Sequence, residues 1–155
     1  MELKQIASFA VDHTKLKPGI YVSRVDGDAV TYDLRMREPN KGDYLEMASM
    51  HTFEHLFATY ARSGPCADSI IYIGPMGCRT GFYMVTRDNL SKQQVIQLIQ
   101  EMCAFVADFH GPIPGATEKE CGNYREQDLE AARKDAIRFG KDIANWTPEK
   151  MEYQK

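Results

Sequence analysis

The chain has 155 residues, 43% of them hydrophobic, which is enough for one globular domain whose core needs no disulfide scaffold. The formal net charge of −3 and the scattered basic residues argue against a nucleic-acid-binding surface. No apolar stretch approaches the roughly 20 residues that span a bilayer, and the N-terminus contains no secretory core. We therefore expect a soluble, cytoplasmic protein.

Two pairs of strands are predicted from short runs of β-branched and aromatic residues. Residues 20–25 and 29–36 flank Asp26-Gly27-Asp28, and this arrangement predicts a β-hairpin. A second pair is predicted at residues 69–73 and 80–86, on either side of a segment rich in glycine and proline.

A long helix is predicted between the two strand pairs. It should begin near Asp43, which can form a capping box with Glu46, and end near Arg62, before Ser63-Gly64-Pro65. Apolar residues occupy much of its circumference. The helix should therefore be largely buried, and its histidines should face the interior or a cleft.

Two further helices are predicted in the second half of the chain. The first has Ser91 as its N-cap and Gln94 at the N3 position, and His110-Gly111-Pro112 should close it, with the glycine in the left-handed C′ position. A weaker pattern predicts a helix near 126–143. The order of elements predicts an α+β fold, a mainly antiparallel β-sheet packed against α-helices, as a single domain over residues 1–155.

The strongest chemical signal is the segment MHTFEHLFA, residues 50–58, on the long helix. His51 and His55 are four residues apart, so their imidazoles lie on one face and can bind one metal ion. Glu54, directly before the second histidine, can serve as a general base. Two alternatives stay open from the spacing: histidines satisfied by hydrogen bonds alone, and a metalloprotease, because H-x-x-E-H is also the inverzincin signature.

The four cysteines differ in what they can do. A catalytic metal site usually has three protein ligands, and Cys121 is a candidate for the third because the glycine after it lets the backbone approach an ion. Cys103 falls on an apolar helix face and is interpreted as a core residue, and Cys66 as an incidental loop residue. Cys78 lies in a turn beside Arg79, whose charge can favour the reactive thiolate; an unreactive turn cysteine is the alternative.

Taken together, the segments H-T-F-E-H-L-F-A, G-P-M-G-C-R-T-G-F-Y and C-G-N-Y resemble the S-ribosylhomocysteine lyase family, whose members make the precursor of autoinducer-2. The resemblance extends to D-H-T-K at 12–15 and D-L-R-M-x-E-P-N at 33–40, and it covers nearly the whole chain. It implies a metal-dependent lyase that cleaves the thioether of S-ribosylhomocysteine to homocysteine and dihydroxypentanedione by carbonyl migration and β-elimination. The implied benefit is quorum sensing or the recycling of a methyl-cycle by-product.

The resemblance also implies a role for eight residues. These are His51, His55 and Cys121 as metal ligands, Glu54 and Cys78 as catalytic acid/base residues, and Ser8, His13 and Arg35 as substrate contacts. The implied cofactor is one divalent ion per subunit, Fe²⁺, which Zn²⁺ or Co²⁺ can replace. The implied partner is a second copy, in a homodimer with active sites at the subunit interface, and we expect the open position of the metal to face Cys78.

Three positions depart from the family pattern. Tyr72 stands where many members carry an aspartate, Glu38 replaces a common glutamine, and Gln127 replaces a histidine. None of them is an expected ligand or acid/base residue, although Tyr72 bears on local substrate contacts. A non-enzymatic alternative is a structural metal module whose ion only joins the long helix to the Cys121 loop. Such a site would have a closed fourth coordination position.

Overall fold

A four-stranded antiparallel sheet with strand order β1-β2-β4-β3 forms the centre of the protein, in a computed structural model that describes residues 1–155. Its strands are β1 (Gly19–Asp26), β2 (Ala29–Arg35), β3 (Ile70–Pro75) and β4 (Gly81–Arg87). Both predicted strand pairs are confirmed, and the first hairpin turns at Gly27, whose φ of +61° suits glycine. Pairing of β2 with β4 joins the two hairpins into one sheet.

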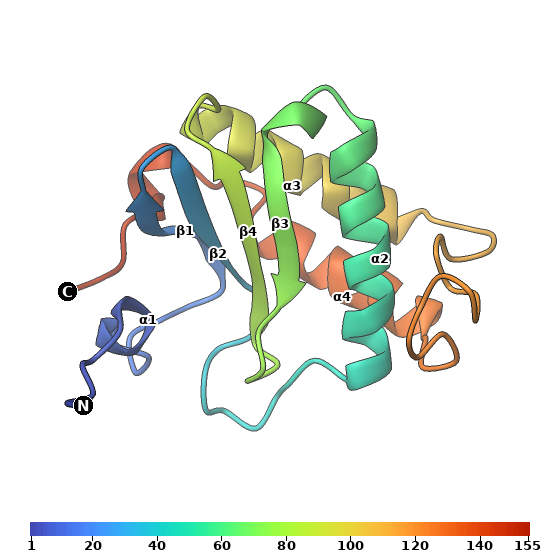
Figure 1. Cartoon of the computed structure of the whole chain (residues 1–155), viewed down its shortest axis with the longest axis horizontal. Coiled ribbons are helices and arrows are strands. Elements are labelled where there is room, and N and C mark those ends of the chain that lie inside the picture. Colours follow the sequence, from blue (N-terminus) through green and yellow to red (C-terminus); the bar gives the residue numbers. More distant parts are fainter.

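Helices cover one face of this sheet (Figure 1). The helices on this face are α2 (Met47–Ser63), α3 (Lys92–Ala107) and α4 (Leu129–Asp142), whereas the short α1 (Ala7–Ala10) lies on the opposite side of the sheet. Short 3₁₀ turns lie at Ala67–Ser69 (η1) and Pro148–Met151 (η2). This arrangement confirms the expected α+β fold. None of the helices combines the length and apolarity needed to cross a membrane.

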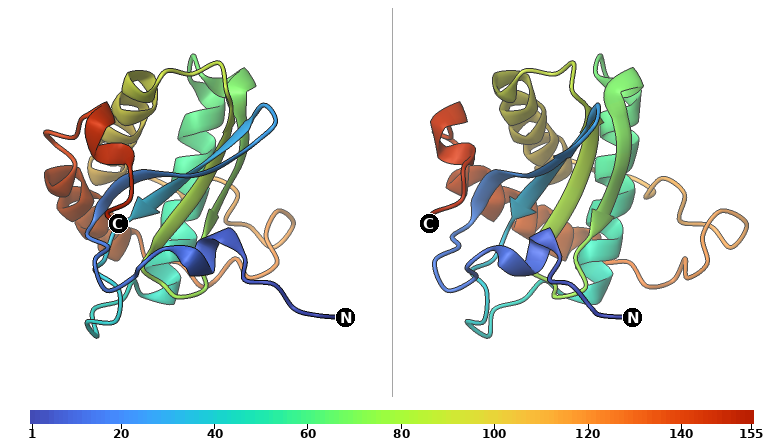
Figure 2. Two further views of the ribbon diagram at one scale, coloured as in Figure 1. Left: turned by 90° about the vertical axis from the view of Figure 1, so that its left-hand side faces the viewer. Right: turned by 60° about the vertical axis from the view of Figure 1, so that its left-hand side comes forward.

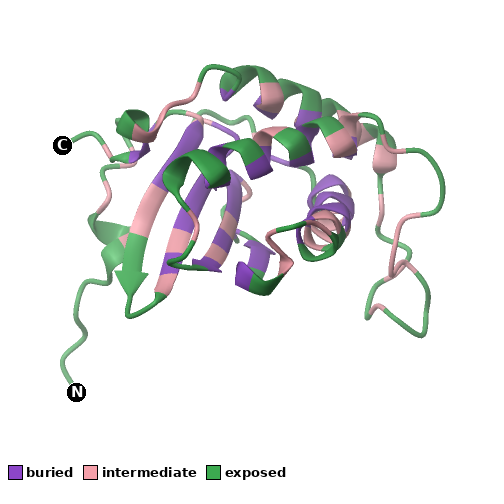
Figure 3. Ribbon diagram, turned by 90° about the horizontal axis from the view of Figure 1, so that it is seen from above, coloured by how far each residue is buried: buried purple, intermediate pink, exposed green.

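The core lies between the sheet and helices α2, α3 and α4. Alternate residues of a strand point to opposite faces, and on β2 the side chains of Tyr32 and Leu34 belong to the buried apolar core. Figure 3 shows the buried residues along the strands and on the inward sides of the helices. Asp33 and Arg35 alternate with these two residues of β2 and therefore point to the other face of the sheet, away from this core. Burying each large apolar side chain in the core contributes about 1.5–3 kcal/mol.

The predicted start of the long helix was wrong. α2 begins at Met47, and Asp43 does not cap it. The Asp43 carboxylate instead forms ion pairs with Arg138 of α4 at 2.7 Å and with Arg37 at 3.3 Å. An arginine from the distant α4 and one from the segment before α2 thus compete with the local cap, and the helix begins four residues later. Its C-terminal end, before Gly64, agrees with the prediction.

The capping box at the start of α3 is confirmed, because the Ser91 side chain accepts from the Gln94 backbone and the Gln94 side chain accepts from the Ser91 backbone. The predicted end was wrong: the helix ends at Ala107 and Asp108 closes it. Gly111 has a φ of +108° but lies beyond the C′ position, in the following loop. The third predicted helix is confirmed as α4.

The two ends of the chain both reach the sheet. α1 is a single turn that periodicity did not indicate, and it belongs to an N-terminal segment rich in exposed apolar side chains. The C-terminal segment returns from α4 to β1 and lies against it (Figure 2). The face of the sheet opposite the core is thus bordered by segments from both termini.

Candidate metal centre

α2 and the loop between α3 and α4 bring together the three expected metal ligands. The Nε2 atoms of His51 and His55 are 3.1 Å apart. The sulfur of Cys121 lies 3.4 Å from Nε2 of His51 and 3.9 Å from Nε2 of His55. All three side chains are half-buried, and their ligand atoms lie within 4.8 Å of one another. These three residues can therefore hold one metal ion.

Backbone carbonyls fix the orientation of both imidazoles. Nδ1 of His51 lies 2.7 Å from the carbonyl oxygen of Glu126, and Nδ1 of His55 lies 2.7 Å from that of Pro114. A carbonyl oxygen only accepts, so each Nδ1 donates its proton and each Nε2 presents a lone pair. Two lone pairs and a sulfur at these distances repel one another unless a cation lies among them. The arrangement therefore fits a metal site with hydrogen-bonded imidazole ligands.

The loop approaches His55 closely at a glycine. A Cβ on Gly115 would lie 3.2 Å from Nδ1 of His55, and the φ of +70° at this position disfavours other residues. Gly115 directly follows Pro114, whose carbonyl accepts from the same ring nitrogen. The glycine thus allows the backbone to orient an expected metal ligand.

Thr52, between the first histidine and the rest of the motif, fastens the Cys121 loop to α2. It is fully buried. Its hydroxyl donates to Oε1 of Gln127 at 2.7 Å and accepts from the backbone N–H of Asp128 at 2.9 Å. Nε2 of Gln127 is 3.2 Å from Nδ1 of His51, so this departure from the family pattern borders the metal site. Sequence reasoning missed Thr52, whose only signal is a polar residue in a largely apolar helix.

Glu54 lies beside the metal ligands on α2. Its side chain is half-buried and has no hydrogen-bond or ion-pair partner within the chain. A carboxylate that no neighbour engages is available to accept and return protons. The geometry therefore leaves Glu54 free for the acid/base role that the family resemblance implies.

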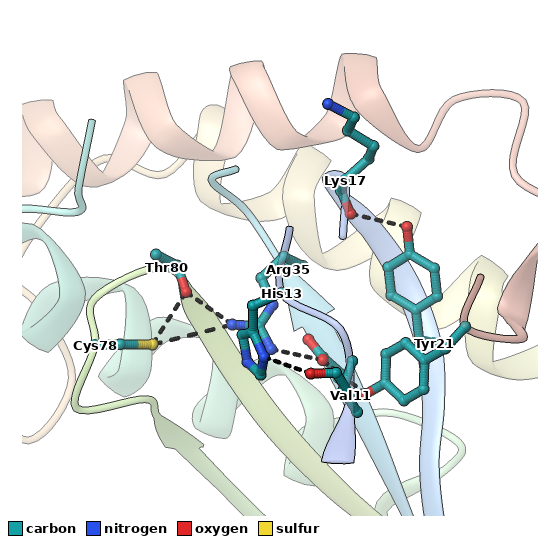
Figure 4. A network of polar contacts seen from close by, with 9 residues as sticks. Val11, His13, Lys17, Tyr21, Arg35, Cys78 and Thr80 are labelled. Carbon is teal, nitrogen blue, oxygen red and sulfur yellow. Dashed lines mark hydrogen bonds and ion pairs between the residues drawn. The ribbon is translucent and has the colours of Figure 1, made fainter. Parts of the chain in front are cut away.

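A second group of expected site residues gathers at the turn between β3 and β4 (Figure 4). Cys78 is exposed there, and its sulfur lies 3.1 Å from the hydroxyl of Thr80 and 4.0 Å from Nη1 of Arg35. Arg35 is 2% exposed. Its Nη1 donates to Thr80 at 2.8 Å and its Nη2 to Asp33 at 2.7 Å. We call Cys78, Thr80, Arg35 and Asp33 the Cys78 cluster.

The cation beside Cys78 is thus not the one that the sequence indicated. Arg79 lies over the ring of Tyr44, 5.6 Å from its centre, and Arg35 from the distant β2 takes the position next to the sulfur. Burial is the largest single influence and would lower the pKa of Arg35, but the negative charge of Asp33 and the hydrogen bond to it, together with Cys78 and Tyr83, outweigh burial, so the pKa is raised. Arg35 therefore carries a permanent positive charge beside the thiol.

Ser8 and His13 lie in the N-terminal segment. Nδ1 of His13 donates to the carbonyl of Val11 at 2.8 Å, which leaves Nε2 available to another partner. Ser8 lines a cavity of about 210 Å³ together with Tyr83 of β4. Neither residue makes a hydrogen bond with the metal ligands or with Cys78. Within one chain, Ser8 and His13 are therefore not connected to either group of expected site residues.

Within one chain, the metal ligands and the Cys78 cluster do not meet. The side-chain polar contacts of Cys78 are with Arg35 and Thr80. The turn that carries Cys78 lies at one end of the sheet, whereas the loop with Cys121 lies on the far side of α2 from the strands (Figures 1 and 2). A single chain therefore does not display the expected approach of Cys78 to the metal ligands.

Comparison with known proteins points to one family. A family model described as S-Ribosylhomocysteinase (LuxS) matches residues 6–150. Similar curated proteins named S-ribosylhomocysteine lyase include that of Clostridium acetobutylicum, 42% identical over 97% of this chain and 99% of the relative. Others are from Desulfotalea psychrophila, 45% identical over 96% of each chain, and Phocaeicola vulgatus, 46% identical over 88% of each. The similarity thus spans both the metal ligands and the Cys78 cluster.

Proposed function

The chain belongs to the S-ribosylhomocysteine lyase family of carbon–sulfur lyases, and on this premise we propose that it cleaves S-ribosylhomocysteine to homocysteine and dihydroxypentanedione. The observation that carries the proposal is the convergence of His51, His55 and Cys121, whose ligand atoms lie within 4.8 Å of one another. They occupy the positions that the family resemblance assigns to the metal. The whole of residues 1–155 then forms one metalloenzyme domain.

The donor set supports a first-row transition metal as the cofactor. Two imidazoles and one thiolate are ligands that such ions prefer, whereas Mg²⁺ and Ca²⁺ prefer oxygen. We propose Fe²⁺, with Zn²⁺ or Co²⁺ able to replace it. Bound by these residues, a divalent ion supplies Lewis-acid stabilisation of the negative charge that develops on the sugar oxygens.

Glu54 and Cys78 are the proposed acid/base residues. Each migration of the sugar carbonyl needs a proton taken from the carbon beside it and a proton delivered one carbon away, so bases are required at more than one position. The charge of Arg35 and the hydroxyl of Thr80 stabilise an anionic Cys78 sulfur. We assign the early transfers to Cys78, and the later transfers and the β-elimination to Glu54.

Ser8, His13 and Arg35 are the proposed substrate contacts. A hydroxyl and a free imidazole nitrogen suit the hydroxyl groups of the sugar. Arg35 is buried and bound to Asp33 and Thr80 in the single chain, so a contact with substrate would come from the edge of its guanidinium beside Cys78. These three roles are inferred from where the residues lie and from the polar groups that their side chains offer.

A homodimer would complete the site. Within one chain Cys78 stays apart from the metal ligands, so a pocket containing both requires a second copy. Large apolar side chains are exposed near the N-terminus and on the edge strand β3, a surface that favours association: Met1, Leu3, Ile6, Phe9 and Tyr72. We propose that the Cys78 cluster of one subunit faces the metal ligands of the other, in a cytoplasmic enzyme whose four cysteines are free.

The test is thiol release from S-ribosylhomocysteine by anaerobically purified protein. The wild type should release homocysteine, and Cys78→Ala and Glu54→Gln should be nearly inactive while folded, because an acid/base group contributes about 10²–10⁴-fold. Cys66→Ala, which removes a thiol remote from both groups, is the matched control and should keep the wild-type rate. No homocysteine from the wild type, or undiminished release from Cys78→Ala, would contradict the proposal.

A further inference from the structure

Tyr153, in the C-terminal segment, forms a hydrogen bond with the buried ion pair of Asp33 and Arg35. The family model matches the chain only to residue 150, and Tyr153 lies beyond it. The hydroxyl of Tyr153 donates to Oδ2 of Asp33 at 2.7 Å, the same oxygen that accepts from Arg35 at 2.7 Å. We propose that Tyr153 is a positioning residue, which acts through Asp33 to hold the Arg35 guanidinium against Thr80 and Cys78. The inference rests on the proposed acid/base role of Cys78.

The position of Tyr153 is defined by several contacts. Its ring stacks on Tyr21 of β1, with ring centres 5.2 Å apart and planes 19° apart. Trp146, earlier in the same segment, packs edge-to-face on Tyr21 and donates from its indole to the carbonyl of Ile20 at 2.9 Å. A Cβ on Gly19 would lie 2.2 Å from the Trp146 ring, so only a glycine leaves room for it. The segment is therefore fastened to β1 over its length.

The ion pair that Tyr153 reaches depends strongly on each of its hydrogen bonds. Asp33 is 1% exposed and Arg35 2% exposed. Oδ1 of Asp33 and Nε of Arg35 have no hydrogen-bond partner. In a buried pair with unsatisfied atoms, each remaining donor matters more than it would at the surface. The phenol therefore influences which way the carboxylate and the guanidinium point.

Three phenols surround this pair, and all of them are neutral near physiological pH. Burial, followed by the negative charge of Asp33, raises the pKa of each; they are Tyr21 of β1, Tyr83 of β4 and Tyr153. Arg79, next to Cys78 in the turn, is directed to Tyr44. The charges within the cluster are thus those of Asp33 and Arg35, together with Cys78 when its thiol is ionised.

Loss of the Tyr153 hydroxyl should change the reactivity of the Cys78 thiol, although the two side chains form no hydrogen bond with each other. Oδ2 of Asp33 would keep Arg35 as its only partner, and the carboxylate would draw the guanidinium toward itself. Nη1 of Arg35 would then withdraw from Thr80 and from the sulfur. An anionic Cys78 would lose part of its stabilisation, so its reactions would require a higher pH.

The experiment is alkylation of the full-length protein by iodoacetamide over a series of pH values, with modification of Cys78 followed by mass spectrometry of its peptide. In Tyr153→Phe the profile should move to higher pH by about half a unit, the size expected when part of one hydrogen bond is lost. Tyr60→Phe is the matched control. Its hydroxyl also donates to a carboxylate, that of Glu101 at 3.4 Å, far from the cluster, so its profile should not move.

A double-mutant cycle shows whether Tyr153 acts through Arg35. Arg35→Lys keeps the charge but cannot span Asp33 and Thr80 as the planar guanidinium does, so its alkylation profile should already be shifted. Adding Tyr153→Phe should cause no further shift. An unchanged profile in Tyr153→Phe alone, or additive shifts in the double variant, would overturn the inference. Alkylation needs no substrate, so inactivity toward S-ribosylhomocysteine would refute the proposed function and leave this test valid.

Discussion

The metal ligands and the Cys78 cluster are held in place by different kinds of interaction. At the metal ligands, backbone carbonyls of Glu126 and Pro114 orient the two imidazoles. In the Cys78 cluster, charged and hydroxyl side chains from β2, the β3–β4 turn and the C-terminal segment orient one another. The difference indicates that substitutions can disturb either region alone, and that the Cys78 cluster is the one sensitive to distant side chains.

The largest effect is expected from removal of a metal ligand. Cys121→Ala should lose stoichiometric metal and nearly all lyase activity, since two imidazoles remain and a catalytic site usually needs three protein ligands. Metal content measured by elemental analysis, against Cys66→Ala as the control, tests this. Metal content in Cys121→Ala equal to that of the control would contradict the assignment of Cys121 as a ligand.

The next largest effect concerns stability. Arg35→Ala leaves the Asp33 carboxylate buried without a cation, and breaking a buried pair in this way costs about 3–5 kcal/mol. Urea unfolding measures the change. Lys17→Ala removes an ion pair of similar length at the surface, 2.6 Å from Glu38, and should cost far less stability because solvent screens the two charges. Equal losses in the two variants would mean that burial does not increase the contribution of the Asp33–Arg35 ion pair to the free energy of unfolding.

A smaller effect is expected when the hydrogen bonds around the metal ligands are weakened. Thr52→Val removes the hydroxyl that fastens Gln127 and Asp128, and loss of such support typically lowers metal affinity about 10–100-fold. Competition for Zn²⁺ with a chelator measures the affinity. Thr86→Val is the matched control, because Thr86 is equally buried and its hydroxyl donates to the neighbouring carbonyl on β4 rather than to the loop that carries Cys121. The same affinity in both variants would leave Thr52 without a role at the metal.

The smallest effect is a pH dependence at Asp43, which joins the segment before α2 to α4. A hydrogen bond from Arg138 lowers the pKa of Asp43, so the ion pair stabilises the protein above the unfolded-state pKa of the carboxyl and is lost as the pH falls through the lower folded value. The pair is half-exposed, so the contribution should stay below about 0.5 kcal/mol. Unfolding of Asp43→Asn should match the wild type in acid and fall slightly below it at neutral pH. An equal difference at both pH values would assign the effect to packing.

Much of the fold was predictable because its signals are local. The hairpin turn at Gly27, the capping box at Ser91 and the two histidines of α2 each depend on residues within four positions of one another. The start of α2 was not predictable in this way, because Asp43 is held by an arginine of α4. The cation beside Cys78 was assigned to its neighbour Arg79 for the same reason: sequence reasoning sees adjacent charges, and Arg35 comes from another strand.

The sequence by itself determined the α+β class, the family and the types of residue in both regions, because periodicity, turn chemistry and motif spacing are properties of short segments. Only the tertiary structure decided which carbonyls orient the imidazoles, since a backbone carbonyl has no signature in the sequence. It also decided that Tyr153 donates to Asp33 across 120 positions of the chain. A contact of that kind exists only after the C-terminal segment has packed on β1, where burial of the aromatic rings fixes the position of the phenol.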